Sequence, residues 1–122
     1  MARHTLPLGF ALAGLLASAV AVQAAAQASA PSAAELTYKD YHAGVYAAVE
    51  CRGAKFSPTD YQVLESRINE RAGENIHAGR QLQMIQDAKT SINTAMSHAG
   101  CGAEEVKAAL IRFDALRGYQ TQ

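Results

Sequence analysis

Apolar residues recur at steps of three and four in four separate segments of the 122-residue chain. This spacing places side chains on one face of an α-helix, whereas a strand would show strict alternation. It predicts helices at about 32–52, 58–72, 80–99 and 103–117, and no segment sustains β alternation. Because short links between helices favour antiparallel neighbours, the pattern predicts an all-α fold, a small antiparallel four-helix bundle.

Two of the predicted helix starts carry capping signals. Ser32 and Glu35 match the capping box, in which each side chain accepts a hydrogen bond from the other residue's backbone amide. Ser57, Pro58 and Asp60 supply a cap, a proline at the first helical position and an acid at the third. We therefore expect helices to begin directly after Ser32 and Ser57.

Each predicted helix has an apolar stripe that is expected to face the core. The stripe positions, in chain order, are Tyr41, Val45, Ala48, Val49, Tyr61, Leu64, Ile68, Leu82, Ile85, Ala88, Ile92, Ala95, Met96, Ala99, Val106, Ala109, Leu110, Phe113 and Leu116. Phe56 is expected to pack on Tyr61 as a hydrophobic staple. Tyr38, Tyr46 and Tyr119 do not fit the stripes, so we expect them to be exposed and to hint at a binding surface.

The two cysteines of the chain can be placed by the same topology. Cys51 lies at the end of the first predicted helix, and Cys101 directly follows the third. Up-and-down packing brings these two positions to the same end of the bundle. We therefore predict a Cys51–Cys101 disulfide that closes a loop of about 50 residues and stabilises the fold by about 4 kcal/mol in the chain-entropy model.

The N-terminal segment has the composition of an export signal. Arg3 precedes an apolar run from Leu6 to Val22, and small residues then offer several cleavage sites. We expect residues 1–26 to be a signal peptide cleaved between positions 24 and 28, 27–31 a disordered linker and 32–118 the helical domain. An even cysteine count agrees with an oxidising compartment, and the bacterial periplasm is the expected location.

The charges of the chain are balanced, with 11 Lys plus Arg and 11 Asp plus Glu. Without a basic excess, we expect no nucleic-acid partner. The second helix is expected to carry a solvated, salt-bridged outer face formed by Glu65, Arg67, Glu70, Arg71 and Glu74. No membrane span is expected in the mature chain, which we expect to be a monomer or a homodimer with a possible protein partner.

Candidate chemistry is sparse. The cysteines are too widely spaced for the C-x-x-C motif of thiol–disulfide enzymes, and no nucleophile elbow or phosphate-binding glycine loop occurs. We therefore expect no enzyme activity, no catalytic residue and no cofactor. The disulfide pair Cys51 and Cys101 forms the only predicted site.

Histidine and methionine residues raise one alternative, a copper site. His77 lies seven residues before Met84, and His98 follows Met96 closely. No H-x-x-x-H motif or dense cluster accompanies them, so the favoured interpretation is surface histidines, His42 included, together with core methionines.

Three functions follow from these features. The first is a small exported accessory protein that binds a partner or has a structural role. The second is a stress chaperone, because the chain resembles the small acid-stress chaperones of the periplasm in size, helix content, export signal and widely spaced cysteines. That resemblance transfers no residue role. The third is a copper-binding protein.

Overall fold

The computed structural model describes residues 29–118. Its helices are α1 (Ala33–Arg52), α2 (Pro58–Ala72), α3 (Ala78–Ala99) and α4 (Glu104–Arg117), and the 3-10 turn η1 (Gly100–Gly102) joins α3 to α4. The predicted helices are thus confirmed, and the described part of the chain contains no strand. The predicted signal peptide and Tyr119 lie outside the described residues, as does the linker up to residue 28; residues 29–31 belong to no helix.

The predicted caps form as expected. Ser32 and Glu35 make a complete capping box at the start of α1, and Ser57 and Asp60 make the second at the start of α2. Phe56 and Tyr61 form the predicted staple, with ring centroids 5.4 Å apart. These local contacts set where the first two helices begin, which in turn sets the residues that each helix turns toward the core.

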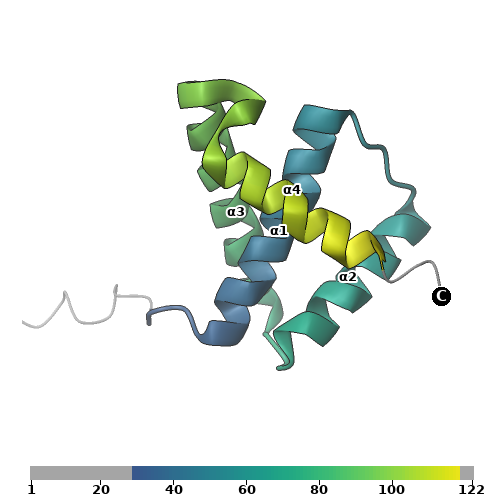
Figure 1. Ribbon diagram of the computed structural model, residues 1–122. Helices are drawn as coiled ribbons and strands as arrows, with labels where there is room; N and C mark the ends of the chain where they lie inside the picture. The colour runs from purple at the N-terminus through teal and green to yellow at the C-terminus, as the bar shows by residue number, and fades with distance from the viewer. Residues whose placement is uncertain (1–28, 119–122) are drawn as a thin grey trace, which may run out of the picture.

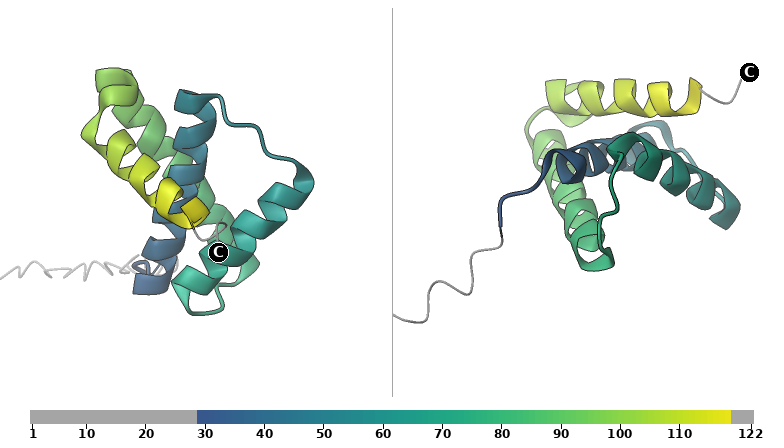
Figure 2. Two further views of the ribbon diagram at one scale, coloured as in Figure 1. Left: turned by 45° about the vertical axis from the view of Figure 1, so that its right-hand side comes forward. Right: turned by 90° about the horizontal axis from the view of Figure 1, so that it is seen from below.

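Helix α1 lies in the middle of the molecule and packs against each of the other three helices. Helix α4 crosses one face of α1, as Figure 1 shows. On the opposite face α2 and α3 diverge from each other, which is clearest in the view from below (Figure 2). The bundle is therefore built around one central helix, and α2 and α3 pack mainly on α1.

Small residues allow α1 and α4 to approach closely. A Cβ atom at Gly44 would lie 2.6 Å from the backbone oxygen of Ala109 and 3.2 Å from Cβ of Phe113. The neighbouring alanines Ala47 and Ala48 are fully buried. Because backbone atoms cannot move aside as a flexible side chain does, Gly44 fixes the distance between these two helices.

The core has two parts of different character. One contains large side chains, namely Tyr38, Val45, Ala48, Leu64, Ile68, Met84, Phe113 and Leu116. The other is built mostly from alanine and lies toward the disulfide, with Ala43, Ala47, Ala88, Ile92, Ala95, Ala103, Val106 and Ala109. Helix α2 contributes only to the first part.

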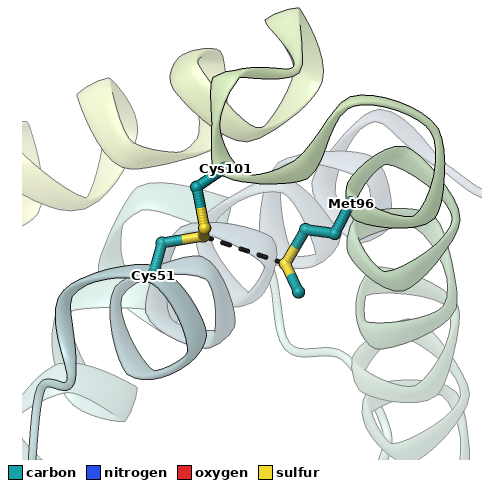
Figure 3. Close-up of a disulfide and its surroundings, with 3 residues drawn as sticks. All are labelled: Cys51, Met96 and Cys101. Carbon is teal, nitrogen blue, oxygen red and sulfur yellow. Dashed lines mark hydrogen bonds between the residues drawn. A yellow bond between two sulfur atoms is a disulfide. The ribbon is translucent and has the colours of Figure 1, made fainter.

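The predicted disulfide joins the end of α1 to η1. The Cα atoms of Cys51 and Cys101 are 5.8 Å apart, within the usual range for a disulfide. Met96 packs beside it, with Sδ 3.8 Å from Sγ of Cys51 (Figure 3). A bonded cysteine has no thiol hydrogen, so this is a sulfur–sulfur packing contact. The intact bond is compatible with an extracytoplasmic location.

Five predictions of side-chain exposure differ from the structure. Tyr38, expected at the surface, is only 1% exposed because α1 is covered on more than one side. Tyr61 and Leu82, expected in the core, are 49% and 58% exposed. They lie on helices that diverge, so each helix buries only the side that faces α1. Tyr46, also expected at the surface, is half-buried, and Ala99, expected in the core, is exposed.

No helix among the described residues is long and apolar enough to span a membrane.

We predict that Gly44→Ala destabilises the protein by about 1–3 kcal/mol, because the added methyl group must push α4 away from α1. The measurement is urea unfolding followed by circular dichroism. Gly79→Ala is the control: it lies in the first turn of α3, and its Cβ would meet only His77 at 3.5 Å. It should leave stability unchanged or raise it. Equal effects of the two substitutions would contradict the close α1–α4 contact.

We predict that replacing both Cys51 and Cys101 by serine lowers the free energy of unfolding by about 4 kcal/mol, because the open chain gains conformational entropy when it unfolds. Urea unfolding measures the loss, and the wild-type protein with its disulfide reduced is the matched comparison. Two reactive thiols in the oxidised protein, titrated in denaturant without reductant, would refute the bond.

Candidate binding groove

A groove of about 880 Å³ lies between α2 and α3, and none of its lining residues comes from α4. Its floor is α1, and the diverging helices form its walls. The lining side chains are His42, Val45, Tyr46 and Val49 from α1, Tyr61, Gln62, Glu65, Ser66 and Asn69 from α2, and Ile85 and Lys89 from α3. A concave, partly apolar site of this size falls within the range of small-molecule pockets.

The groove exists because α2 and α3 are each held to α1 at some distance from one another. Leu64 and Ile68 anchor α2, while Met84 and Ala88 anchor α3. At one end the two walls meet, where the Gln81 side chain donates a hydrogen bond to Asn69 (3.3 Å). Away from this bridge the walls separate, and the floor of α1 becomes accessible.

The apolar part of the groove consists of side chains that the helical spacing assigned to the core. Val45 is buried in the floor, Val49 and Ile85 are half-buried, and Tyr61 is half exposed. Leu82 lies one turn before Ile85 on α3 and continues the apolar surface beyond the lining residues. Val49, Tyr61 and Ile85 keep part of their surface exposed, because no fifth element of the described chain covers this side of the bundle.

A polar cluster around Glu65 joins α1 to α2 beside this apolar surface. The hydroxyl of Tyr38 donates a hydrogen bond to Oε1 of Glu65 (2.5 Å). The Asn69 side chain donates to the same oxygen (3.2 Å) and to the backbone carbonyl of Glu65 (2.9 Å). The second oxygen, Oε2, lies 2.9 Å from Nε2 of His42. Both carboxylate oxygens therefore have a protein partner.

His42 is held between Tyr38 and Glu65. Its ring centroid is 4.5 Å from that of Tyr38. Its Nε2 atom is buried, and the short distance to Glu65 is an ion-pair contact rather than an aligned hydrogen bond, because Nε2 has no hydrogen-bond partner of good geometry among the described residues. The contact is electrostatically favourable when the imidazole is protonated.

The cluster shifts the ionisation of its members. Burial alone would raise the pKa of Glu65, but the contacts with His42, Tyr38 and Asn69 together outweigh it and lower that pKa. Burial, reinforced by the hydrogen bond to Glu65, raises the pKa of Tyr38 far above its usual value. Glu65 is therefore a carboxylate at neutral pH, and Tyr38 remains a hydrogen-bond donor.

Lys89 lies on the opposite wall. Its ammonium nitrogen is 5.8 Å from the ring centroid of Tyr46. The hydroxyl of Tyr46 in turn donates a hydrogen bond to Asn93 (3.0 Å), which fixes the ring against α3. Within residues 29–118 no carboxylate pairs with Lys89. The groove thus has, on the α2 wall, a carboxylate whose oxygens are both engaged within the protein, and on the α3 wall a cation without a carboxylate partner among the described residues.

Outside the groove, Glu35 and Arg80 tie the start of α1 to the start of α3. Nε and Nη2 of Arg80 each donate to one oxygen of Glu35, both at 2.8 Å. The hydrogen bond from Arg80, followed by that from the Ser32 amide, lowers the pKa of Glu35 from 4.5 to about 2. The same carboxylate therefore caps α1 and holds α3.

The structure brings the predicted cysteines together, and the residues considered for the alternative copper site lie in different surroundings. His77 is exposed while Met84 is buried in the core, and His98 is exposed while Met96 packs beside the disulfide. Among the described residues, no group of three or more His, Cys, Asp or Glu side chains is arranged to hold a metal ion.

The sequence prediction missed the Glu65 cluster. It placed His42 on the surface and Glu65 on a solvated outer face, whereas their side chains are only 15% and 36% exposed. A partial signal existed, because Tyr38 and His42, like Glu65 and Asn69, are four residues apart and so share a helix face. Spacing within one helix cannot show, however, which face of another helix it meets.

Comparison with known proteins adds no relative: no protein-family model, curated protein or solved structure matches the chain.

We predict that Glu35→Gln removes part of the acid sensitivity of folding. Because the pKa of Glu35 is lowered in the folded state, its contribution is fully present above pH 4.5 and is lost as pH falls through about 2. The stability difference between the wild type and Glu35→Gln should be largest at pH 6 and shrink below pH 3.

Urea unfolding at several pH values measures this difference. The matched control for removing one carboxylate is Glu74→Gln, at an exposed position between α2 and α3. A difference between wild type and Glu35→Gln that stays constant from pH 6 to pH 2 would show that Arg80 does not hold an ionised Glu35.

Proposed function

We propose that this protein is an exported, noncatalytic binding protein that holds a ligand in the groove between α2 and α3. The observation that carries the proposal is the groove itself, about 880 Å³ in volume and floored by α1. Its apolar residues Val45, Val49, Tyr61 and Ile85 lie on a side of α1 that another packed helix covers in a closed bundle. A ligand with apolar surface would complete that burial, at roughly 25 cal/mol per Å² of apolar area covered.

The polar residues of the groove support binding rather than catalysis. Glu65 is engaged by Tyr38, His42 and Asn69, so this carboxylate serves to attach α2 to α1. A general base needs an accessible oxygen near the proton it removes. The carboxylate oxygens of Glu65 are instead engaged by other residues of the protein. This favours a structural role for Glu65 in holding the α2 wall of the groove in place.

The proposed location is the periplasm. The Cys51–Cys101 bond suits an oxidising compartment, and the composition of residues 1–26 is that of a cleavable export signal. A domain this small gains much of its stability from a disulfide, and such a bond persists in an oxidising compartment.

The acid-stress chaperone remains a prediction. It is supported by the Glu35–Arg80 tie between α1 and α3, whose stabilising contribution declines below pH 4.5 and is lost as pH falls through about 2. Its first requirement is loss of the native fold near pH 3, and the acid titration of wild-type stability described above measures this. Retention of the fold at that pH would remove this alternative, whereas groove binding at neutral pH does not depend on it.

The groove can be tested by filling it. Ser66 is exposed and lies on the α2 wall, so Ser66→Trp should occupy the groove without disturbing the core. We expect the purified, oxidised protein to bind the neutral apolar dye Nile red with enhanced fluorescence, and Ser66→Trp to weaken this binding at least about tenfold.

The control is Ala115→Trp, at an exposed position on α4, which lies on the other face of α1. It adds the same indole ring and should leave dye binding unchanged. Absence of dye binding by the wild type, or equal loss in the two variants, would overturn the proposed function.

A further inference from the structure

We propose that the ligand of the groove is a small anionic amphiphile, a carboxylate with one medium-length alkyl chain, whose charged group pairs with Lys89. This inference rests on the proposed function and specifies its ligand. It follows from three properties of the groove: the charge left unmatched on its walls, its length, and the order of apolar and polar positions along α3.

The pairing of charged groups in the groove favours an anion at Lys89. Its single carboxylate, Glu65, already has a partner on each oxygen, from Tyr38 and Asn69 on one side and His42 on the other. Lys89 has no carboxylate partner within the described range, and its ammonium group lies over the ring of Tyr46. An ammonium group has three donors, and a ring face uses none of them fully. An anionic oxygen would supply the missing acceptor.

The length of the groove favours a small molecule over a helix of another protein. On the floor, the lining residues extend from His42 to Val49, which is about 10 Å at 1.5 Å per residue. The α2 wall, from Tyr61 to Asn69, is about 12 Å long on the same basis. Two helical turns would fill this length, and the Gln81–Asn69 hydrogen bond blocks continuation at one end. A helix of a partner protein would therefore contact the groove over only about two turns.

The arrangement along α3 matches an amphiphile. Leu82, Ile85 and Lys89 succeed one another at steps of three and four, so they lie on one face of the helix. Within the groove the apolar Ile85 therefore precedes the cation Lys89, and Leu82 lies just outside the lining. On the facing wall, the exposed amide of Gln62 and hydroxyl of Ser66 offer neutral hydrogen bonds. An alkyl chain along Ile85 and Val45 would place its carboxylate beside Lys89.

Three single-chain probes with different head groups test this inference at pH 8: decanoate, decanol and decyltrimethylammonium, the two ionic probes below their micelle-forming concentrations and decanol below its solubility limit. Displacement of Nile red from the purified, oxidised protein gives the relative affinities. We expect decanoate to bind about fivefold or more tightly than decanol, as for a partly exposed ion pair, and the cationic probe to bind most weakly. The preference should diminish as salt is added.

Variants of Lys89 test whether its charge accounts for the preference for decanoate. Lys89→Met keeps the length and apolar character of the side chain and should reduce decanoate binding about fivefold, to the level of decanol. Lys89→Arg keeps the charge and should retain the preference. Lys55→Met, which removes an exposed lysine outside the groove, is the matched control and should change nothing.

The outcomes separate the two proposals. Equal binding of decanoate and decanol, or tighter binding of the cation, overturns the anionic ligand and leaves the groove as a binding site. Failure of Nile red itself to bind overturns the proposed function. Light scattering adds one further outcome: a wild-type dimer that Ser66→Trp converts to a monomer would show that a second copy of the chain fills the groove, which also overturns the ligand proposed here.

Discussion

The close contact of α1 with α4 at Gly44 is the constraint on which the rest of the structure depends. A Cβ atom at this position would lie 2.6 Å from the carbonyl oxygen of Ala109, so no side chain fits there without moving α4. With α4 pressed onto one face, α1 becomes a central support, tied to α3 at its start by Glu35–Arg80 and to α4 near its end by Arg52–Asp114. The remaining face of α1 must then serve both α2 and α3, and they cover it incompletely.

Helical periodicity and capping chemistry predict most of this fold, because they are local properties. The capping boxes at Ser32 and Ser57 fix helix starts, and the glycine at position 53 ends α1 in the left-handed conformation (φ 61°). The disulfide also follows from the topology. Successive helices run in opposite directions, so the ends of the first and third helices lie at the same end of the bundle. Periodicity does not show how many sides of a helix are covered. Tyr38 is buried and Leu82 exposed because α1 has three neighbours and α3 has open space on one side.

These errors bear on function as well as on prediction. An apolar residue on the predicted core-facing stripe that stays exposed in the fold marks a part of the core that no element covers. Tyr61 on the groove wall is such a residue. The Glu65 cluster could be predicted only in part, for a related reason. Its members come from two helices, and only tertiary packing sets Tyr38 and His42 opposite Glu65 and Asn69. The candidate site thus arises where long-range geometry departs from the local pattern.

The position of the disulfide relative to α2 has a consequence for the integrity of the chain. Both segments that flank α2, 53–57 and 73–77, lie inside the loop closed by Cys51 and Cys101. Surface connections such as these are the usual points of proteolytic attack. A single cut in either segment leaves two polypeptides that are still joined covalently. The frame of α1, α3 and α4 therefore keeps its covalent link after a cut beside α2, and the molecule separates into fragments only when the disulfide is reduced.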